Sequence, residues 1–161
     1  MILIAGIGNI FLGDDAFGVE VVRRLSSRGL PPNVSVVDFG IRSYDLAYAL
    51  MEPWKLIILV DALPRGGTPG TLYAMEPELI HAGEASSSFD AHTMNPVSVL
   101  QLVSALGGSP GRLLVVGCEP ASMEADDFGQ IGLSPPVEAA IDEALRMIEQ
   151  LIADVRKPTA A

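Results

Sequence analysis

The chain has 161 residues, of which 49% are hydrophobic and only 19% are charged. This length is typical of a single domain with a buried core of its own, and the composition is the opposite of that of a disordered protein. Twenty acidic residues against ten basic ones give a net charge of −10, which argues against a nucleic acid or an anionic membrane as a partner.

The single cysteine, Cys118, excludes a disulfide within the chain and favours a reducing compartment. The apolar N-terminus, residues 1–8, has no basic region and no cleavage signal of small residues, so we interpret it as a first core strand. No uninterrupted apolar run reaches the roughly 18–20 residues that a membrane span needs. We therefore expect a cytoplasmic protein without a membrane partner.

Strand-like and helix-like segments alternate along the chain. Short apolar runs predict strands, and apolar residues at helical spacing that are bounded by capping residues, glycine or proline predict helices. The predicted strands are Ile2–Gly6, Val34–Phe39, Lys55–Val60, Gly70–Met75 and Arg112–Val116. The predicted helices are residues 17–25, 43–51, 96–106 and 135–152. Asn95 and Ser134, each followed by a proline, are the predicted N-caps of the last two helices.

This alternation predicts an α/β fold, a single-domain three-layer sandwich with helices on both faces of a twisted, mostly parallel, five-stranded sheet. The segment Gly70–Met75 follows the preceding strand without a helix between them, so we expect it to be an antiparallel edge strand. Residues 1–156 should form the domain, and residues 157–161 a disordered tail. The serine-rich segment 81–91 has no periodicity, which predicts a mobile loop.

Two positions in this pattern carry candidate catalytic carboxylates. Asp61 closes the apolar run 56–60, and ligands of open α/β sheets bind at such strand ends, where the strand order reverses. Asp14 and Asp15 stand at the start of the first helix. One of them would serve as the helix cap, which leaves the other as the candidate catalytic residue. With a 2-1-3 strand order, Asp15 and Asp61 would face each other across one crevice. Alternatively, Asp61 only caps the turn that follows it.

His92 follows the serine-rich loop and precedes the helix cap Asn95. An imidazole that can swing toward two carboxylates would suit a borderline divalent metal, although a lone loop histidine is also often exposed to solvent. His81 has no comparable setting, and we expect it to be exposed.

Three motifs that resemble other active sites lack the required context. The turn Gly6–Asn9 lacks the third glycine of a dinucleotide fingerprint and the lysine of a phosphate-binding loop. Ser109 matches a nucleophile motif formally, but its predicted order is helix–turn–strand, so it is a turn residue. Cys118 stands beside Glu119, whose charge raises a thiol pKa, so we expect a buried residue at a strand end and not a nucleophile.

The segment Gly6–Gly18, GIGNIFLGDDAFG, resembles the N-terminal signature of the hydrogenase maturation endopeptidases. These proteases remove the C-terminal extension from the large subunit of nickel–iron hydrogenases. The resemblance continues through Val60–Ala62, His92, Gly117–Pro120 and Gly132–Ser134. It implies a twisted five-stranded sheet between helices, which agrees with the fold predicted above.

The resemblance also implies a site and a substrate. Asp15, Asp61 and His92 match the metal-contacting residues of the family, so they are the expected catalytic and metal-binding residues. The nickel would belong to the large-subunit precursor, which the protease cleaves only after nickel insertion. Three protein ligands leave coordination positions open for substrate cysteines, and other divalent metals could occupy the site in the isolated protein. A water activated by the metal or by a carboxylate would attack the scissile peptide.

Two other functions remain open from the sequence. The first is a non-catalytic chaperone on the same fold, which would bind nickel or the precursor without cleaving it. The second is a phosphate- or nucleotide-handling enzyme, which the missing glycine and lysine disfavour.

Overall fold

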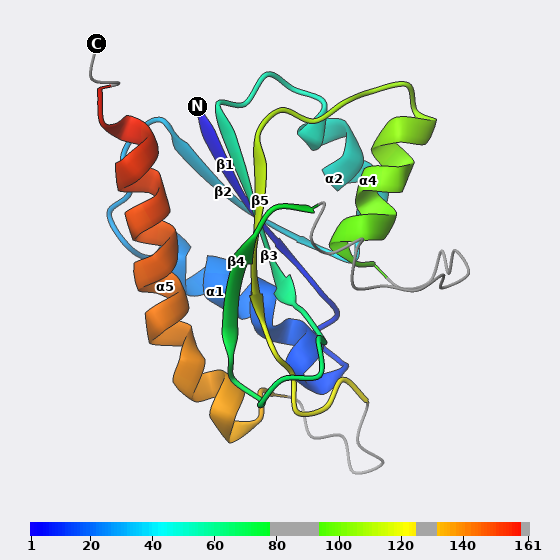
Figure 1. The fold of residues 1–161 in the computed structure, drawn as a ribbon, viewed down its shortest axis with the longest axis vertical. Coiled ribbons are helices and arrows are strands. Elements are labelled where there is room, and N and C mark those ends of the chain that lie inside the picture. Colours follow the sequence, from blue (N-terminus) through cyan, green and yellow to red (C-terminus); the bar gives the residue numbers. More distant parts are fainter. Residues whose placement is uncertain (78–93, 125–131, 159–161) are drawn as a thin grey trace.

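The structure is a computed structural model that describes residues 1–77, 94–124 and 132–158. Within these residues, five strands form one twisted sheet in the order β2-β1-β3-β5-β4 (Figure 1). The strands are β1 Ile2–Ile7, β2 Val34–Gly40, β3 Leu56–Ala62, β4 Leu72–Met75 and β5 Leu113–Cys118. The described helices are the 3-10 helix η1 Gly13–Ala16 and the α-helices α1 Phe17–Ser26, α2 Ser43–Leu50, α4 Pro96–Ala105 and α5 Pro135–Arg156.

The sheet topology places a strand-order reversal at its centre. Strand β1 pairs in parallel with both β2 and β3, and β3 pairs in parallel with β5. Strand β4 pairs with β5 in the antiparallel direction at the edge of the sheet. The sheet therefore has the 2-1-3 order on which the crevice between Asp15 and Asp61 depends, and the predicted antiparallel edge strand is confirmed. The reversal of strand order lies between β1 and β3, where open α/β sheets bind ligands.

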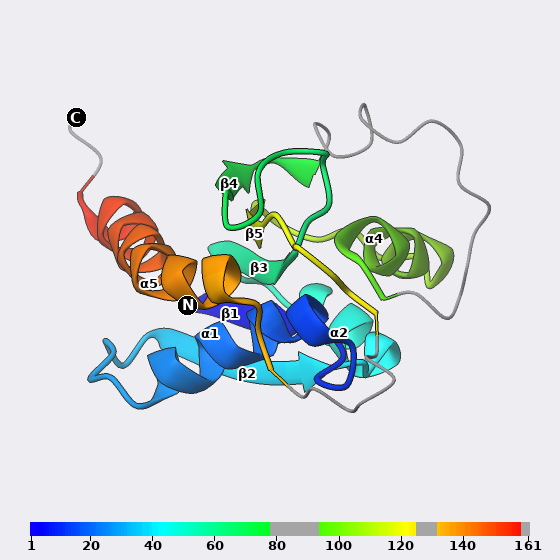
Figure 2. The ribbon, with the colours of Figure 1, turned by 90° about the horizontal axis from the view of Figure 1, so that it is seen from below.

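Helices cover both faces of the sheet, which explains why its central strands are continuously apolar. Helices α1 and α5 lie on one face, and α2 and α4 lie on the other (Figures 1 and 2). Every residue of β1 and of β3 is buried. Alternate residues of β3 pack into opposite cores, Ile58 with the α1 and α5 side chains and Leu59 with those of α2 and α4. Burying one such aliphatic side chain contributes about 1.5–3 kcal/mol.

The two predicted helix caps have different outcomes. Asn95 caps α4 as predicted, because its side chain accepts from the Ser98 N–H and the Ser98 hydroxyl accepts from the Asn95 N–H. Ser134 stands at the N-cap position of α5, but its side chain makes no capping hydrogen bond. Its hydroxyl donates instead to Asp14, so the predicted side-chain cap is wrong.

Strand β3 is longer than the sequence predicts. Its ladder with β5 continues past Val60, so Asp61 pairs with Gly117 inside the strand and does not follow it. The predicted loop 81–91 lies outside the described residues. Helix α5 ends at Arg156, at the predicted domain boundary, and of the predicted tail the structure describes residues 157–158. In the described part of the chain, no helix combines the length and apolar character needed to cross a membrane.

Candidate active site

Asp61 is a buried carboxylate with an unsatisfied oxygen. Its side chain is fully buried, and in the described part of the chain its Oδ1 has no hydrogen-bond partner. Burial raises the pKa of Asp61 well above its usual range, the nearby charge of Asp15 raises it further, and a backbone hydrogen bond from Ala62 opposes the shift. An orphaned buried oxygen of this kind is costly in a folded protein and therefore needs an explanation.

Asp15 is positioned by the turn between β1 and η1. Its Oδ2 accepts a hydrogen bond from the Asn9 N–H at 2.8 Å. Gly8 has a φ of 138° and lies so close to Asp15 that a Cβ would stand 1.8 Å from the Asp15 carbonyl oxygen, so only glycine allows this approach. Asp15 is half-buried, which raises its pKa, while the Asn9 hydrogen bond lowers it.

The structure brings Asp15 and Asp61 within electrostatic reach of each other, as the strand order predicts. In the described part of the chain, neither carboxylate takes part in an ion pair. Two adjacent carboxylates, one of them buried and unsatisfied, fit a cation that neutralises both, and oxygen donors of this type suit a divalent metal.

The third predicted ligand, His92, lies outside the described residues, as does His81. Accordingly, no group of three histidine, cysteine, aspartate or glutamate side chains that could hold a metal occurs among residues 1–77, 94–124 and 132–158. The structure therefore brings together two of the three predicted site residues and leaves the third untested.

Asp14 has a structural role that differs from the predicted helix cap. Neither η1 nor α1 has a side-chain cap, so the interpretation of one aspartate as an N-cap is wrong. The fully buried Asp14 carboxylate instead accepts backbone N–H bonds from Ala121, Ser122 and Ser134 at 2.8, 3.2 and 2.7 Å, and the Ser134 hydroxyl donates to it at 2.8 Å. Asp14 thus joins η1 to the segments on either side of residues 125–131.

Glu119 is a third buried carboxylate that sequence reasoning used only as a neighbour of Cys118. It accepts hydrogen bonds from the N–H groups of Arg65 and Gly66 and from the Tyr73 hydroxyl, at 2.8, 3.0 and 2.9 Å. These bonds hold the loop that follows β3, and therefore the end of the strand that carries Asp61. Its sequence signal is the same as that of Asp61, namely an acidic residue at the end of an apolar strand.

Two of the three motifs that lack an active-site context, Cys118 and Ser109, behave as predicted. Burial raises the pKa of Cys118 to about 12, and the charges of Asp14 and Glu119 add to this effect. A thiol with this pKa is protonated at neutral pH and is no nucleophile. Ser109 lies exposed between α4 and β5, in the predicted helix–turn–strand order.

Comparison with known proteins decides the family. A family model described as hydrogenase maturation protease matches residues 19–151. The chain belongs to the hydrogenase maturation protease family. The hydrogenase 2 maturation protease of Escherichia coli is 34% identical over 97% of this chain and 91% of its own length. The delta subunit of the coenzyme F420 hydrogenase of Methanothermobacter thermautotrophicus is 36% identical over 91% of each chain.

Solved structures of hydrogenase maturation proteases share the fold. The hydrogenase maturating endopeptidase HybD of E. coli superposes with a TM-score of 0.77 at 31% identity, covering 96% of this chain and 93% of that one. The nickel–iron hydrogenase maturation protease HycI of Thermococcus kodakarensis gives a TM-score of 0.64 at 30% identity, covering 98% and 92%. The resemblance, the α/β fold and the prediction of a peptidase are confirmed, and family membership supports processing of a hydrogenase precursor.

Proposed function

We propose that this maturation protease removes the C-terminal extension of the large-subunit precursor of a nickel–iron hydrogenase after nickel insertion. In this proposal, Asp15, Asp61 and His92 contact the nickel that the precursor carries. The observation that carries the proposal is the buried Oδ1 of Asp61, which has no hydrogen-bond partner among the described residues and lies near a second carboxylate. A substrate-borne cation supplies the missing partner, so the site is satisfied only when a loaded precursor is bound.

The arrangement of the sheet supports His92 as the third contact. Side chains alternate along β3, and Leu59 and Leu63 both pack on the α2 and α4 face. By the same alternation, Asp61 projects toward that face. In the sequence, His92 precedes by three positions Asn95, the N-cap of α4, and α4 packs on this same face. An imidazole with two carboxylates forms a donor set suited to nickel.

The two carboxylates also fit the chemistry of peptide hydrolysis. The nickel supplies a positive charge that polarises the scissile carbonyl. Near that charge both carboxylates ionise, which overcomes the effect of burial on their pKa values. Asp15 is the half-buried member of the pair and can accept a proton from an attacking water and pass it to the leaving amine. The unpaired Cys118 supports a reaction in the cytoplasm.

The proposal is tested by the intact mass of a nickel-loaded large-subunit precursor after incubation with the protease. The wild-type protein should shorten the precursor at its C-terminus. Asp15→Ala, Asp61→Ala and His92→Ala should each lower the rate at least about a hundredfold. Asp142→Ala is the matched control, because Asp142 is an exposed carboxylate of α5, and its rate should equal that of the wild type.

Two outcomes would contradict the proposal. Unchanged cleavage by Asp15→Ala and Asp61→Ala would refute the site. Tight binding of the precursor without any loss of mass would instead favour the alternative of a non-catalytic chaperone on the same fold.

A further inference from the structure

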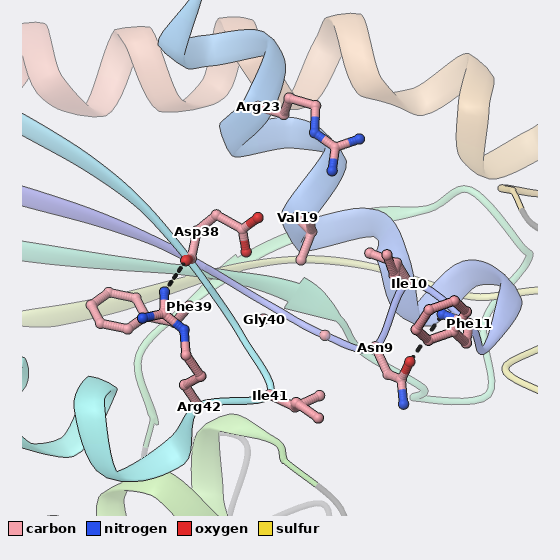
Figure 3. Close-up of a pocket in the computed structure, with 11 residues that line it drawn as sticks. Asn9, Ile10, Phe11, Val19, Arg23, Asp38, Phe39, Gly40, Ile41 and Arg42 are labelled. Atoms are coloured by element: carbon pink, nitrogen blue, oxygen red, sulfur yellow. Dashed lines mark hydrogen bonds between the residues drawn. The ribbon is translucent and has the colours of Figure 1, made fainter.

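A pocket of about 340 Å³ lies beside the turn after β1, the turn whose Asn9 N–H donates to Asp15 (Figure 3). Its walls come from the turn after β1, from the first turns of α1 and from the end of β2. Asn9 belongs both to this wall and to the candidate site, because its N–H donates to Asp15. A polypeptide that reaches Asp15 can therefore pass over this pocket.

The pocket combines exposed apolar side chains with the charged side chains of Arg23, Asp38 and Arg42. Ile10, Phe11 and Ile41 are 39%, 64% and 63% exposed, and all three line the pocket. Figure 3 shows Ile10 and Phe11 on the turn after β1, with Ile41 across from them at the end of β2. Single exposed apolar side chains are common, whereas a cluster around a hollow marks a binding surface.

A second hollow of about 290 Å³ adjoins this pocket, because Ile10, Val19 and Arg23 line both, and it extends to Leu133, just before α5. We call the two hollows together the groove. Two adjoining hollows suit an extended chain segment better than a compact small molecule.

Asn9 adds a polar group that suits a peptide backbone. Its Oδ1 accepts the Phe11 N–H at 2.9 Å, which fixes the side chain. Its Nδ2 has no hydrogen-bond partner in the described part of the chain, and Figure 3 shows this nitrogen turned away from Phe11. A fixed amide donor beside apolar side chains is the combination that recognises a carbonyl oxygen of an extended peptide.

We propose that this groove binds an extended segment of the hydrogenase precursor, with a large apolar side chain between Phe11 and Ile41 and a backbone carbonyl on Asn9 Nδ2. The inference rests on the proposed function and names the surface that positions its substrate. The groove and the candidate site share the turn after β1, because Asn9 lines the groove and its N–H donates to Asp15, so a segment bound there lies beside the turn that positions Asp15.

The test is the cleavage kinetics of the nickel-loaded precursor with the double variant Phe11→Ser/Ile41→Ser. The KM should rise at least about tenfold while kcat stays within about twofold, because the variant removes binding area and leaves the carboxylates intact. The control is Tyr44→Ser/Tyr48→Ser. These tyrosines are 62% and 59% exposed on α2 and do not line the groove, so KM should stay within about twofold of the wild type.

The outcomes separate this inference from the proposed function. If the wild type cleaves the precursor and the double variant has the wild-type KM, the groove proposal is wrong and the proposed function stands. If the wild type does not cleave, the proposed function fails, and calorimetric titration with the same precursor tests the groove alone. In that titration, weaker binding by the double variant supports the groove, whereas equal binding refutes it. The proposal would also be overturned if the wild type sedimented as a dimer and the double variant as a monomer, because a second copy of the chain would then cover the groove.

Discussion

Asp14 and Asp15 are adjacent, identical in type and different in role. The Asp14 carboxylate is fully buried and satisfied by four donors, whereas Asp15 is half-buried and accepts one described hydrogen bond, from Asn9. Asp61 differs again, because it is buried with an oxygen left unsatisfied. The role of each carboxylate follows from how its oxygens are satisfied, and burial alone does not separate Asp14 from Asp61.

The raised pKa of Asp61 gives a prediction for Asp61→Asn in the metal-free protein. Below about pH 3 the carboxyl is mostly protonated in both the folded and the unfolded state, so the variant should have little effect. As pH rises, the unfolded state releases this proton while burial makes the folded state retain it, and the free energy of unfolding falls. Asp61→Asn removes this loss, so at pH 7 it should be more stable than the wild type by about 1–3 kcal/mol.

Urea denaturation in the presence of a chelator, at several pH values between 4 and 7, measures this difference. The stability advantage of Asp61→Asn should grow with pH, and the same variant should be inactive. A wild type as stable as the variant at pH 7 would show that the environment of Asp61 tolerates the charged form.

The sequence singles out Asp61 by its place after an apolar run, but it does not separate Asp14 from Asp15, for a physical reason. An acidic residue that ends a fully apolar strand is a local signal. The groups that satisfy Asp14 come from Ala121, Ser122 and Ser134, which are 107, 108 and 120 positions further along the chain. No local pattern contains that information.

Between elements, the site depends on how closely α1 approaches the sheet. Gly18 stands in the first turn of α1, where an added Cβ would lie 2.0 Å from the Val60 carbonyl oxygen and 2.4 Å from that of Ile7. This contact brings the helix against β1 and β3 next to Asp15 and Asp61. The atoms that this Cβ would meet belong to the backbone, which cannot move aside without a large cost in free energy.

Gly18→Ala should therefore destabilise the protein by about 3 kcal/mol or more, because α1 must move away from the sheet. Gly29→Ala is the matched control, since Gly29 follows the same helix and a Cβ there meets nothing within 4 Å. That control should differ from the wild type by less than about 1 kcal/mol. Thermal unfolding of both variants measures the contrast, and equal midpoints for the two would refute the close-packing explanation.

Asp14→Ala tests the connection between η1 and the chain before α5. The variant leaves the N–H groups of Ala121, Ser122 and Ser134 without their buried acceptor, so the free energy of unfolding should fall by about 2–4 kcal/mol. Urea denaturation measures the loss. Asp142→Ala serves again as the exposed control, and a loss no larger than in that variant would contradict the structural role of Asp14.

The sequence predicts a helix or strand correctly where the signal lies in the residues of that element. It fails where pairing with another strand sets the end of the element. The antiparallel direction of β4 follows from the missing helix before Gly70–Met75, and the cap of α4 follows from Asn95. The end of β3 does not follow from its own residues, because pairing with Gly117 of β5 carries the strand through Asp61.

In the whole molecule, the acidic excess has two distinct parts. Most carboxylates lie on the surface, where ion pairs such as Arg28–Glu149 contribute about 0–1 kcal/mol each. Among the described residues, the buried charged side chains are Asp14, Asp61 and Glu119, and all three gather at the carboxyl edge of the sheet. Asp14 and Glu119 are satisfied by protein donors and hold the surrounding loops, which leaves Asp61 with Asp15 as the pair that we propose contacts a cation of the substrate.

The most direct test of this assignment compares two forms of one large-subunit precursor, nickel-loaded and nickel-free, incubated with the wild-type protease and followed by intact mass. If the nickel completes the Asp15 and Asp61 site, the loaded precursor should lose its C-terminal extension at least about a hundredfold faster than the nickel-free form. Equal rates for the two forms would contradict nickel recognition by these carboxylates.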